Sequence, residues 1–233
     1  MQEVSLGEGD MEGITIVCFL WYGDRWGKDD MGAVYTQRLV NGVRRNLSIQ
    51  PRIVCLTDLP LVLDGAEIIR FDPPSRLGCL PKLCMFDPGL GFRGQVLSLD
   101  IDIVVTGSLD ELAGYRGPFC VRSKFLERLK HQADGDIVGF RAEDREVIEQ
   151  VWDPFIHDVK AAESFTGGRE RFWYRRQMDC LDRWQDLFPG QVVSYKRHVR
   201  GIGRLPAEAR LVSCHGRPRP HEIREAWVTK HWI

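Results

Sequence analysis

The sequence contains no apolar run near the roughly 18 residues that a membrane-spanning helix needs. It has no basic N-terminal region followed by an apolar stretch, so it predicts no secretory signal. The formal net charge of −1 supplies no basic field for binding nucleic acid. We therefore expect a cytoplasmic globular protein without a nucleic-acid partner. Residues 1–12, which are acidic and contain glycine, predict a disordered tail.

The sequence has no Cys-x-x-Cys pair among its seven cysteines. Cys18, Cys55, Cys120 and Cys214 lie in apolar, strand-like runs, where cysteine packs as a small hydrophobic residue. Zinc ligation and a disulfide framework are both disfavoured, and a reducing compartment fits best.

Apolar strands alternate with amphipathic segments along the first half of the chain. Residues 14–21 and 52–58 predict buried strands, and apolar residues at spacings of three and four between 31 and 47 predict a helix. A short third strand follows at 66–71, and a short helix carrying Lys82 at 80–86. This order predicts a βαβ unit and a parallel sheet. Further helices are expected at 147–156 and 172–184.

The central stretch Val96–Val105 is an apolar, β-branched run with two carboxylates two residues apart. If the stretch is one strand, Asp100 and Asp102 point to the same face. Two like charges in apolar surroundings need a cation, which could be an Arg, a Lys or a divalent metal. Carboxylate oxygens are hard ligands that suit Mg²⁺ or Mn²⁺ better than Zn²⁺.

Other candidate residues follow the neighbouring strands. Asp58 ends the second strand, and Trp21 and Tyr22 end the first. Ligands of open α/β sheets collect at the carboxyl ends of the strands, so these side chains could share one crevice with Asp100 and Asp102. The alternatives are a turn-forming role for Asp58 and simple packing for the two aromatic residues.

The C-terminal segment, residues 191–233, is basic, with nine Lys or Arg and three acidic residues. Within it, His215 directly follows a predicted strand, and Gly216 and Arg217 come next. A neutral imidazole can ligate a metal, glycine permits close backbone approach, and arginine binds phosphate. A solvated basic face is the simpler alternative, and weak peripheral membrane association is the most it would give.

Together these pieces resemble bacterial GT-A-fold glycosyltransferases related to the family 8 retaining enzymes, the group of glycogenin and the lipopolysaccharide galactosyltransferases. The matching segments span nearly the whole chain after residue 13. They are the strands at 14–21 and 52–58, Pro81-Lys82-Leu83, the Asp-x-Asp motif followed by Gly-Ser-Leu-Asp in 96–112, residues 189–198, and the closing His-Gly-Arg-Pro-Arg-Pro of 215–220.

The resemblance implies an α/β fold: one GT-A-type domain over residues 13–233, with a mostly parallel, Rossmann-like sheet flanked by helices. Residues 13–105 would form the nucleotide-binding half, and residues 106–233 the acceptor and sugar half with the diphosphate-binding segment. It also implies transfer of a sugar, with retention, from a nucleotide sugar, most often a UDP-sugar, to a glycan or other hydroxyl acceptor, with Mn²⁺ or Mg²⁺.

The resemblance also implies roles for single residues. Asp100 would lie near the ribose and the metal, and Asp102 and His215 would bind the metal. The strand ending in Trp21 and Tyr22 would form the nucleotide pocket with Asp58. Gly216 and Arg217 would contact the diphosphate, with Lys82 nearby.

The chain departs from its relatives around the donor sugar. Relatives carry Gly-Asp-Gln in a late helical region, where the nearest text here is Arg-Arg-Gln-Met-Asp at 175–179. Gln177 would hold the glutamine's place, with the acidic residue either missing or displaced to Asp179. Asp136 would either contact sugar hydroxyls or simply begin a strand. Two alternatives remain open: a nucleotidyltransferase of similar architecture, and a non-catalytic nucleotide-sugar-binding protein.

Overall fold

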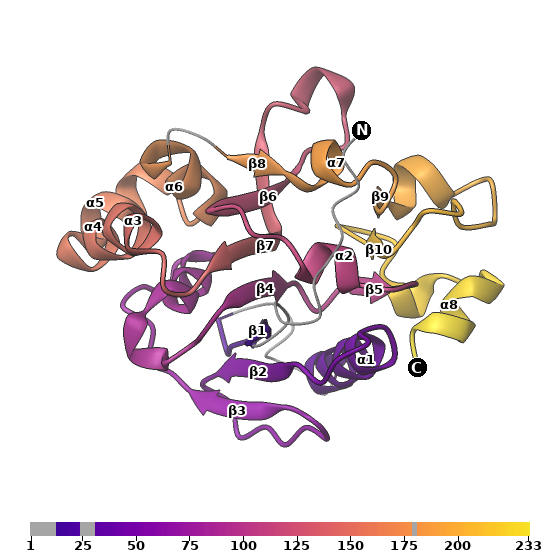
Figure 1. Ribbon diagram of the computed structural model, residues 1–233, viewed down its shortest axis with the longest axis horizontal. Coiled ribbons are helices and arrows are strands. Elements are labelled where there is room, and N and C mark those ends of the chain that lie inside the picture. Colours follow the sequence, from indigo (N-terminus) through magenta and orange to yellow (C-terminus); the bar gives the residue numbers. More distant parts are fainter. Residues whose placement is uncertain (1–12, 24–30, 179–180) are drawn as a thin grey trace.

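The chain is described by a computed structural model that covers residues 13–23, 31–178 and 181–233 (Figure 1). The strands are β1 Thr15–Leu20, β2 Arg52–Thr57, β3 Glu67–Arg70, β4 Gln95–Leu99, β5 Ile103–Val105, β6 Phe119–Ser123, β7 Ala133–Arg141, β8 Asp182–Arg183, β9 Val192–Ser194 and β10 Leu211–Ser213. The α-helices are α1 Met31–Arg45, α2 Asp110–Ala113, α3 Arg145–Val147, α4 Asp153–His157, α5 Val159–Thr166, α6 Glu170–Gln177, α7 Trp184–Leu187 and α8 Ala226–His231. The predicted tail, residues 1–12, lies outside the described residues.

The main sheet has seven strands in the order β3-β2-β1-β4-β7-β6-β8. Four of its six pairings are parallel, and β7 runs antiparallel to both of its neighbours. The expected strand–helix–strand unit is present as β1, α1 and β2, with β1 and β2 parallel. The prediction of a mostly parallel α/β sheet is therefore confirmed.

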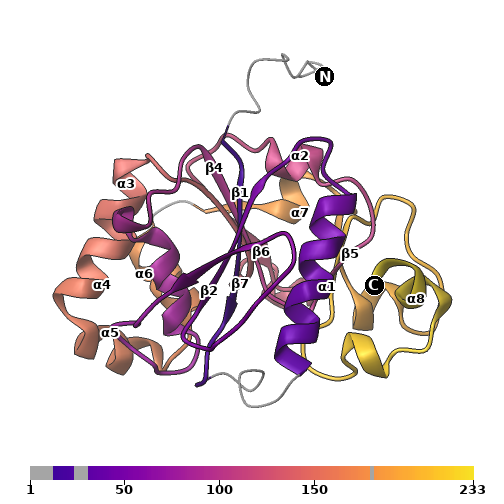
Figure 2. The same ribbon diagram turned by 90° about the horizontal axis from the view of Figure 1, so that it is seen from below.

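Both faces of the main sheet are buried, because successive strand residues enter different cores. In β1, Ile16 and Cys18 belong to the core that contains α1, whereas Val17 and Phe19 belong to the core that contains α4 and α6. Figure 2 shows the strands between a layer of α3 to α6 and a layer formed by α1 and α8. A sheet covered on both sides leaves its strand ends as the places where polar side chains can gather.

Helix α1 buries the face formed by its apolar residues at helical spacing, including Tyr35, Leu39 and Val43. The C-terminal segment packs across this helix. The Trp232 ring lies edge-on against Tyr35 with 4.8 Å between ring centroids, and the Arg38 guanidinium lies 4.1 Å from the Trp232 ring centre. These contacts fasten the basic C-terminal segment onto the first half of the chain.

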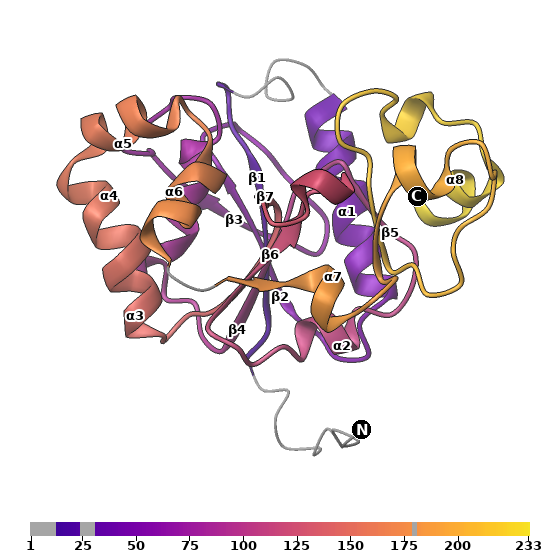
Figure 3. The same cartoon turned by 90° about the horizontal axis from the view of Figure 1, so that it is seen from above.

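A smaller sheet carries the remaining strands in the order β5-β10-β9. Strand β10 runs antiparallel to β5 and parallel to β9. The division into halves at residue 105 stays a prediction, and the two segments interlock, because β5 from the first pairs with β10 from the second. Figure 3 shows β5 beside α1, away from the helices α3 to α6.

The expectation of one strand from Val96 to Val105 is wrong. The chain leaves the main sheet after Leu99, turns at 100–102 and enters the smaller sheet at Ile103. The backbone N–H of Ile103 donates to the carbonyl of Asp100 at 3.0 Å, which closes the turn. The two aspartates are therefore neighbours in a connection between sheets, and the alternation of a strand does not orient them.

The predicted helix at 172–184 is also partly wrong. Helix α6 ends at Gln177, and residues 182–183 form β8, whose Asp182 pairs with Cys120 of β6. The short helix at 80–86 is confirmed as a 3-10 helix. The region 147–156 is helical as expected, with a π-helical turn at Ile148–Trp152 between α3 and α4.

Two predicted absences can be compared with the structure. None of the described helices is long and apolar enough to cross a membrane. Cys18, Cys55, Cys120 and Cys214 are buried free thiols, as their apolar surroundings in the sequence predict.

Candidate active site

Polar side chains gather at one edge of the main sheet. Asp100 follows β4, and Arg122 lies near the carboxyl end of β6, which runs parallel to β4 because both are antiparallel to β7. Asp134 and Asp136 lie near the amino end of β7, which is at the same edge. The site therefore combines carboxyl ends of parallel strands, where ligands of α/β sheets collect, with the start of an antiparallel strand.

Asp100 is held by Lys82. Its carboxylate forms an ion pair with the Lys82 ammonium, and its backbone N–H donates to the Asp136 carbonyl at 2.9 Å. Burial, together with the nearby charges of Asp102 and Asp136, raises the pKa of Asp100 to about 7 despite the Lys82 charge. The Asp100 side chain is still 28% exposed, so it can meet a ligand from solvent.

Asp102 is paired with a different cation. Its carboxylate forms an ion pair with Arg219, and both side chains are 7% exposed. The backbone N–H of Arg219 donates to Glu222 at 2.6 Å, which anchors this part of the C-terminal segment. Among the compensating cations that the sequence left open, an Arg, a Lys or a divalent metal, the structure shows Lys82 beside Asp100 and Arg219 beside Asp102.

A bulge in β7 positions the next carboxylates. Val121 pairs with Val138 and Arg122 pairs with Asp134, so β7 inserts three residues between adjacent partners. The buried Arg122 contacts Asp134 at 2.8 Å and also forms an ion pair with Asp136. The other Asp136 oxygen accepts a hydrogen bond from Ser213 at 2.7 Å, so both oxygens of this predicted sugar contact are engaged.

Glu170 is a site residue that sequence reasoning missed. It begins α6, is buried, and places its Oε1 atom 3.9 Å from the Lys82 ammonium. Gly135 permits this approach, because a Cβ atom there would lie 2.1 Å from Oε1 of Glu170. Burial raises the pKa of Glu170. The pair Gly167-Gly168 just before the helix start was the only local signal.

His215 lies beside the site with its ring held by two neighbours. Its Nε2 atom is 3.0 Å from the Ser194 hydroxyl, and its ring is stacked with Phe125 at 15° between planes. His198 faces the same phenyl ring edge-on and accepts the Ser194 backbone N–H at Nδ1, at 3.0 Å. Burial lowers the pKa of both histidines, so both are neutral imidazoles near pH 7.

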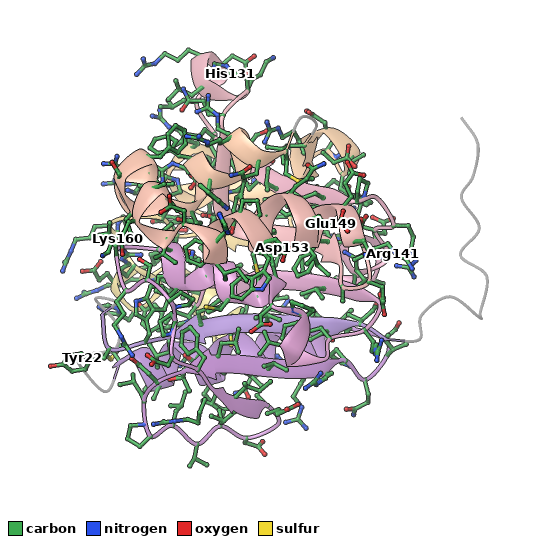
Figure 4. All side chains as sticks on the ribbon, turned by 90° about the vertical axis from the view of Figure 1, so that its left-hand side faces the viewer. Tyr22, His131, Arg141, Glu149, Asp153 and Lys160 are labelled. Carbon is green, nitrogen blue, oxygen red and sulfur yellow. The ribbon has the colours of Figure 1, made fainter. Side chains whose placement is uncertain are left out.

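The residues predicted for the nucleotide pocket divide into two groups. The structure brings Tyr22 and Asp58 together, since the Tyr22 backbone N–H donates to Asp58 at 2.9 Å. Arg76 forms an ion pair with the same carboxylate at 2.5 Å. The Trp21 ring is buried in the core against Phe19, which is the packing alternative. Figure 4 shows the Tyr22 side chain projecting outward from the described part of the structure.

The diphosphate contacts predicted after His215 lie at the surface. Arg217 is 83% exposed and paired with Glu222. Gly216 has a φ of 72°, and a Cβ atom there would lie 2.7 Å from the Lys196 ammonium, so Lys196 approaches the chain where only glycine leaves room.

Gln177 is not brought to this edge of the sheet. Gln177 ends α6, whereas Glu170 begins it. The seven helical steps between them correspond to about 10 Å along the helix axis. Asp179 lies outside the described residues. The acidic side chain next to Lys82 is Glu170, at the other end of the same helix.

The donor atoms fit a hard divalent cation in part. Five carboxylates are linked by ion pairs to four cations, and we call these nine side chains the ionic centre. With every group ionised it carries one excess negative charge. The residues are Asp100, Asp102, Asp134, Asp136, Glu170, Lys82, Arg122, Lys124 and Arg219. Magnesium is commonly held by one or two carboxylates plus substrate phosphates. Asp100 and Asp102 could provide the carboxylates. Across the described ranges, no three His, Cys, Asp or Glu side chains are grouped to hold a metal alone.

A cavity of about 510 Å³ adjoins the site on the side away from Tyr22 and Asp58. Ser123, Lys124 and Phe125 line it from β6 and the turn that follows, and Gln185 and His198 also line it. It touches the ionic centre through Lys124, whose ammonium lies 3.6 Å from Asp134. His131, which also lines it, lies on the hairpin that projects at the top of Figure 4.

No protein-family model matches the chain, and no curated protein does either. Among solved structures, the glycosyltransferase GlyE of Streptococcus pneumoniae TIGR4 is similar with a TM-score of 0.63 at 16% identity, over 91% of this chain and 59% of that one. The galactosyltransferase LgtC, solved with donor and acceptor sugar analogues, gives 0.61 at 12% identity, over 93% and 94%. The bifunctional glycosyltransferase WbbM gives 0.60 at 11% identity, over 94% and 51%.

These similarities establish the fold. The chain has the α/β architecture of these glycosyltransferases, which confirms the fold class implied by the resemblance. It spans nearly all of LgtC, but only about half to three fifths of WbbM and GlyE.

Proposed function

We propose that this protein is a glycosyltransferase that takes a sugar from a nucleotide-sugar donor, with a UDP-sugar favoured, and transfers it to a hydroxyl acceptor. The observation that carries the proposal is the Asp100-Ile101-Asp102 turn. It lies at the carboxyl end of β4, next to buried basic side chains, in a fold shared with glycosyltransferases.

The nucleotide would lie at the ends of β1 and β2. Asp58 is fixed there by the Tyr22 backbone and by Arg76, and its carboxylate can accept hydrogen bonds from a base or a ribose. The exposed Tyr22 ring offers a face on which a base can stack. The diphosphate would then reach the Asp100–Asp102 turn from this side.

Breaking the bond between the anomeric carbon and the diphosphate leaves negative charge on the leaving group. Mn²⁺ or Mg²⁺ held by Asp100 and Asp102, with His215 nearby, would supply a Lewis acid for that charge. Lys82, Arg219 and Arg217 supply positive charge from the chain itself, and preorganised charges stabilise a transition state strongly where water is excluded. Arg219 would exchange Asp102 for the phosphate, since both are oxyanions.

The acceptor would enter through the cavity lined by Phe125, Gln185 and His198. The cavity adjoins the ionic centre opposite the nucleotide residues, and its size is ordinary for a small-molecule site. Because Nδ1 of His198 accepts a backbone N–H, the ring proton is on Nε2, so this histidine would donate to an acceptor oxygen. Retention of configuration is proposed from the resemblance alone.

The test is a thermal-shift panel of UDP, GDP, CDP and ADP, each with and without Mn²⁺. A ligand at about 100 times its Kd should stabilise the protein by roughly 2.7 kcal/mol. We expect a shift with UDP that depends on Mn²⁺, and its loss in Asp102→Ala. Failure of every nucleotide to shift well-folded protein would refute the proposal.

Donor hydrolysis separates an enzyme from a binding protein. The donors tested are the glucose, galactose and N-acetylglucosamine conjugates of the nucleotide that gives the thermal shift. The measured quantity is the release of the nucleoside diphosphate from each donor. An enzyme of this type releases it slowly without an acceptor. Tight binding with no release from any donor, with or without added glycans, would favour the non-catalytic binding protein.

A further inference from the structure

Glu170 is a buried carboxylate whose charge is only partly compensated. Its side chain is 4% exposed, and within the described part of the chain its Oε2 atom has no hydrogen-bond partner. The cation nearest to it by ion pairing is Lys82, at 3.9 Å from Oε1. A buried carboxylate with so little compensation lowers stability, so its presence calls for a role.

Lys82 already has a closer partner. Its ammonium pairs with Asp100 and also lies 3.4 Å from the Gly135 carbonyl. Burial lowers the pKa of Lys82, but the charges of Asp100 and Glu170 outweigh burial and raise it well above the usual value. Lys82 therefore stays charged, and in the unliganded protein Asp100 is its main counter-ion.

We propose that Glu170 is the second counter-ion of Lys82. Glu170 pairs with the Lys82 ammonium when the Asp100 carboxylate binds a ligand instead. The inference rests on the proposed function, in which Asp100 serves a cation and a diphosphate. Without Glu170, engaging Asp100 would leave a buried ammonium unpaired, which is strongly unfavourable. With Glu170, Lys82 keeps its charge and its place beside the leaving group.

The local structure is built to admit this carboxylate. Gly135 has no side chain at the one point where a Cβ atom would overlap Oε1 of Glu170, at 2.1 Å. Glu170 is the first residue of α6, where the helix dipole favours a negative charge. Because Glu170 contacts Lys82 and no proposed substrate atom, it is a positioning residue.

This exchange of the Lys82 counter-ion from Asp100 to Glu170 can be tested without any ligand. Asp100→Asn imitates an engaged Asp100 by removing its charge, and Glu170→Gln is then measured by thermal unfolding in the parent and in Asp100→Asn. In the parent, Glu170→Gln should leave Tm unchanged or raise it, because Asp100 still pairs with Lys82. In Asp100→Asn it should lower Tm by roughly 10 °C, because Lys82 loses its last carboxylate.

Glu163→Gln, at a glutamate that pairs with Lys160 on the surface, is the matched control and should shift Tm equally in both backgrounds. An equal shift for Glu170→Gln in both backgrounds would overturn the proposal. If Asp100→Asn does not fold, Lys82→Met replaces it. Glu170→Gln should then raise Tm by removing an unpaired buried charge, and a fall would contradict the proposal.

A second measurement links the exchange of the Lys82 counter-ion to the binding of Mn²⁺ and UDP. In the thermal-shift assay with UDP, Glu170→Gln should raise the half-saturating Mn²⁺ concentration by roughly tenfold or more, since Lys82 no longer releases Asp100 readily. An unchanged Mn²⁺ titration would contradict the proposal. If the parent binds no nucleotide, the proposed function fails, while the ligand-free comparison still decides the role of Glu170.

Discussion

Two groups of charged residues at the same sheet edge differ in burial and therefore in energetics. Around Asp58, the pairing Arg76 side chain is 50% exposed, so water competes for the charge of the arginine. Around Asp136, the Arg122 side chain is 3% exposed and the Asp136 side chain 10%, so neither can lose its partner cheaply. The difference indicates that the Arg76–Asp58 pair can rearrange at little cost, whereas the Arg122–Asp136 pair is fixed by its surroundings.

The largest effect is expected from breaking the buried group. Arg122→Met removes the cation that Asp134 and Asp136 share. Asp134 keeps Lys124, but leaving the buried Asp136 without a cation should cost about 3 kcal/mol or more of unfolding free energy. Urea unfolding at pH 7 measures it. Arg145→Met, at an exposed ion pair, is the control. A loss similar to that of the control would show that water reaches the ionic centre.

A smaller effect is expected at Gly135. Gly135→Ala places a methyl group against Glu170 and forces the carboxylate away from Lys82, and such overpacking typically costs about 1–3 kcal/mol. The double variant Gly135→Ala with Glu170→Ala should lose less stability than the sum of the two single variants, because removing the Glu170 side chain relieves the overlap, which urea unfolding can check. Full additivity would mean that the methyl group acts elsewhere.

The pH dependence should also distinguish the two groups. With a pKa of about 7, Asp100 gains its charge as the pH rises through neutrality. Mn²⁺-dependent UDP binding should therefore strengthen between about pH 6 and pH 8, because a cation needs the ionised carboxylate. Because the folded-state pKa is raised, its contribution to unliganded stability is full below the normal pKa and is lost as the pH rises through about 7.

Isothermal titration across this pH range measures the binding. Asp58→Asn should keep the slope with pH, because Asp58 lies outside the ionic centre. A pH-independent affinity in the parent protein would contradict a role for Asp100 in binding the cation.

The smallest effect is expected at the surface pair. Arg76→Ala removes an exposed partner of Asp58, which still accepts the Tyr22 backbone N–H, so the unfolding midpoint should not change measurably. UDP affinity should fall only slightly, as followed by the same titration. A clear loss of stability would mean that the nucleotide side is as fixed as the ionic centre.

The sequence predicts the regular part of this fold and fails where distant contacts decide. Strands β1 and β2 and helix α1 follow from hydrophobic period and spacing, because their burial is set locally. The turn at Asp100 interrupts an apolar run that reads as one strand. Its partners are Lys82 and, more than a hundred residues away, Arg219, so no local signal marks it.

The candidate site was predictable to a similar extent. The Asp-x-Asp motif, Lys82 and Asp58 stood out by residue type and position, and the structure gathers them at one edge. Glu170 and Arg122 did not, because a single charged residue in a helix or strand usually faces water. Only the packing of α6 against the β7 bulge makes Glu170 part of the centre.

The connection at 100–102 has a consequence for how this protein can evolve. It is a three-residue bridge whose first end belongs to one sheet and whose last end belongs to another. Since Ile103, Val104 and Val105 are all buried in register with β10, one inserted residue would shift this register or move both aspartates away from their cations. Loop length here should be invariant, so an insertion scan of the chain should find its sharpest intolerance at this bridge.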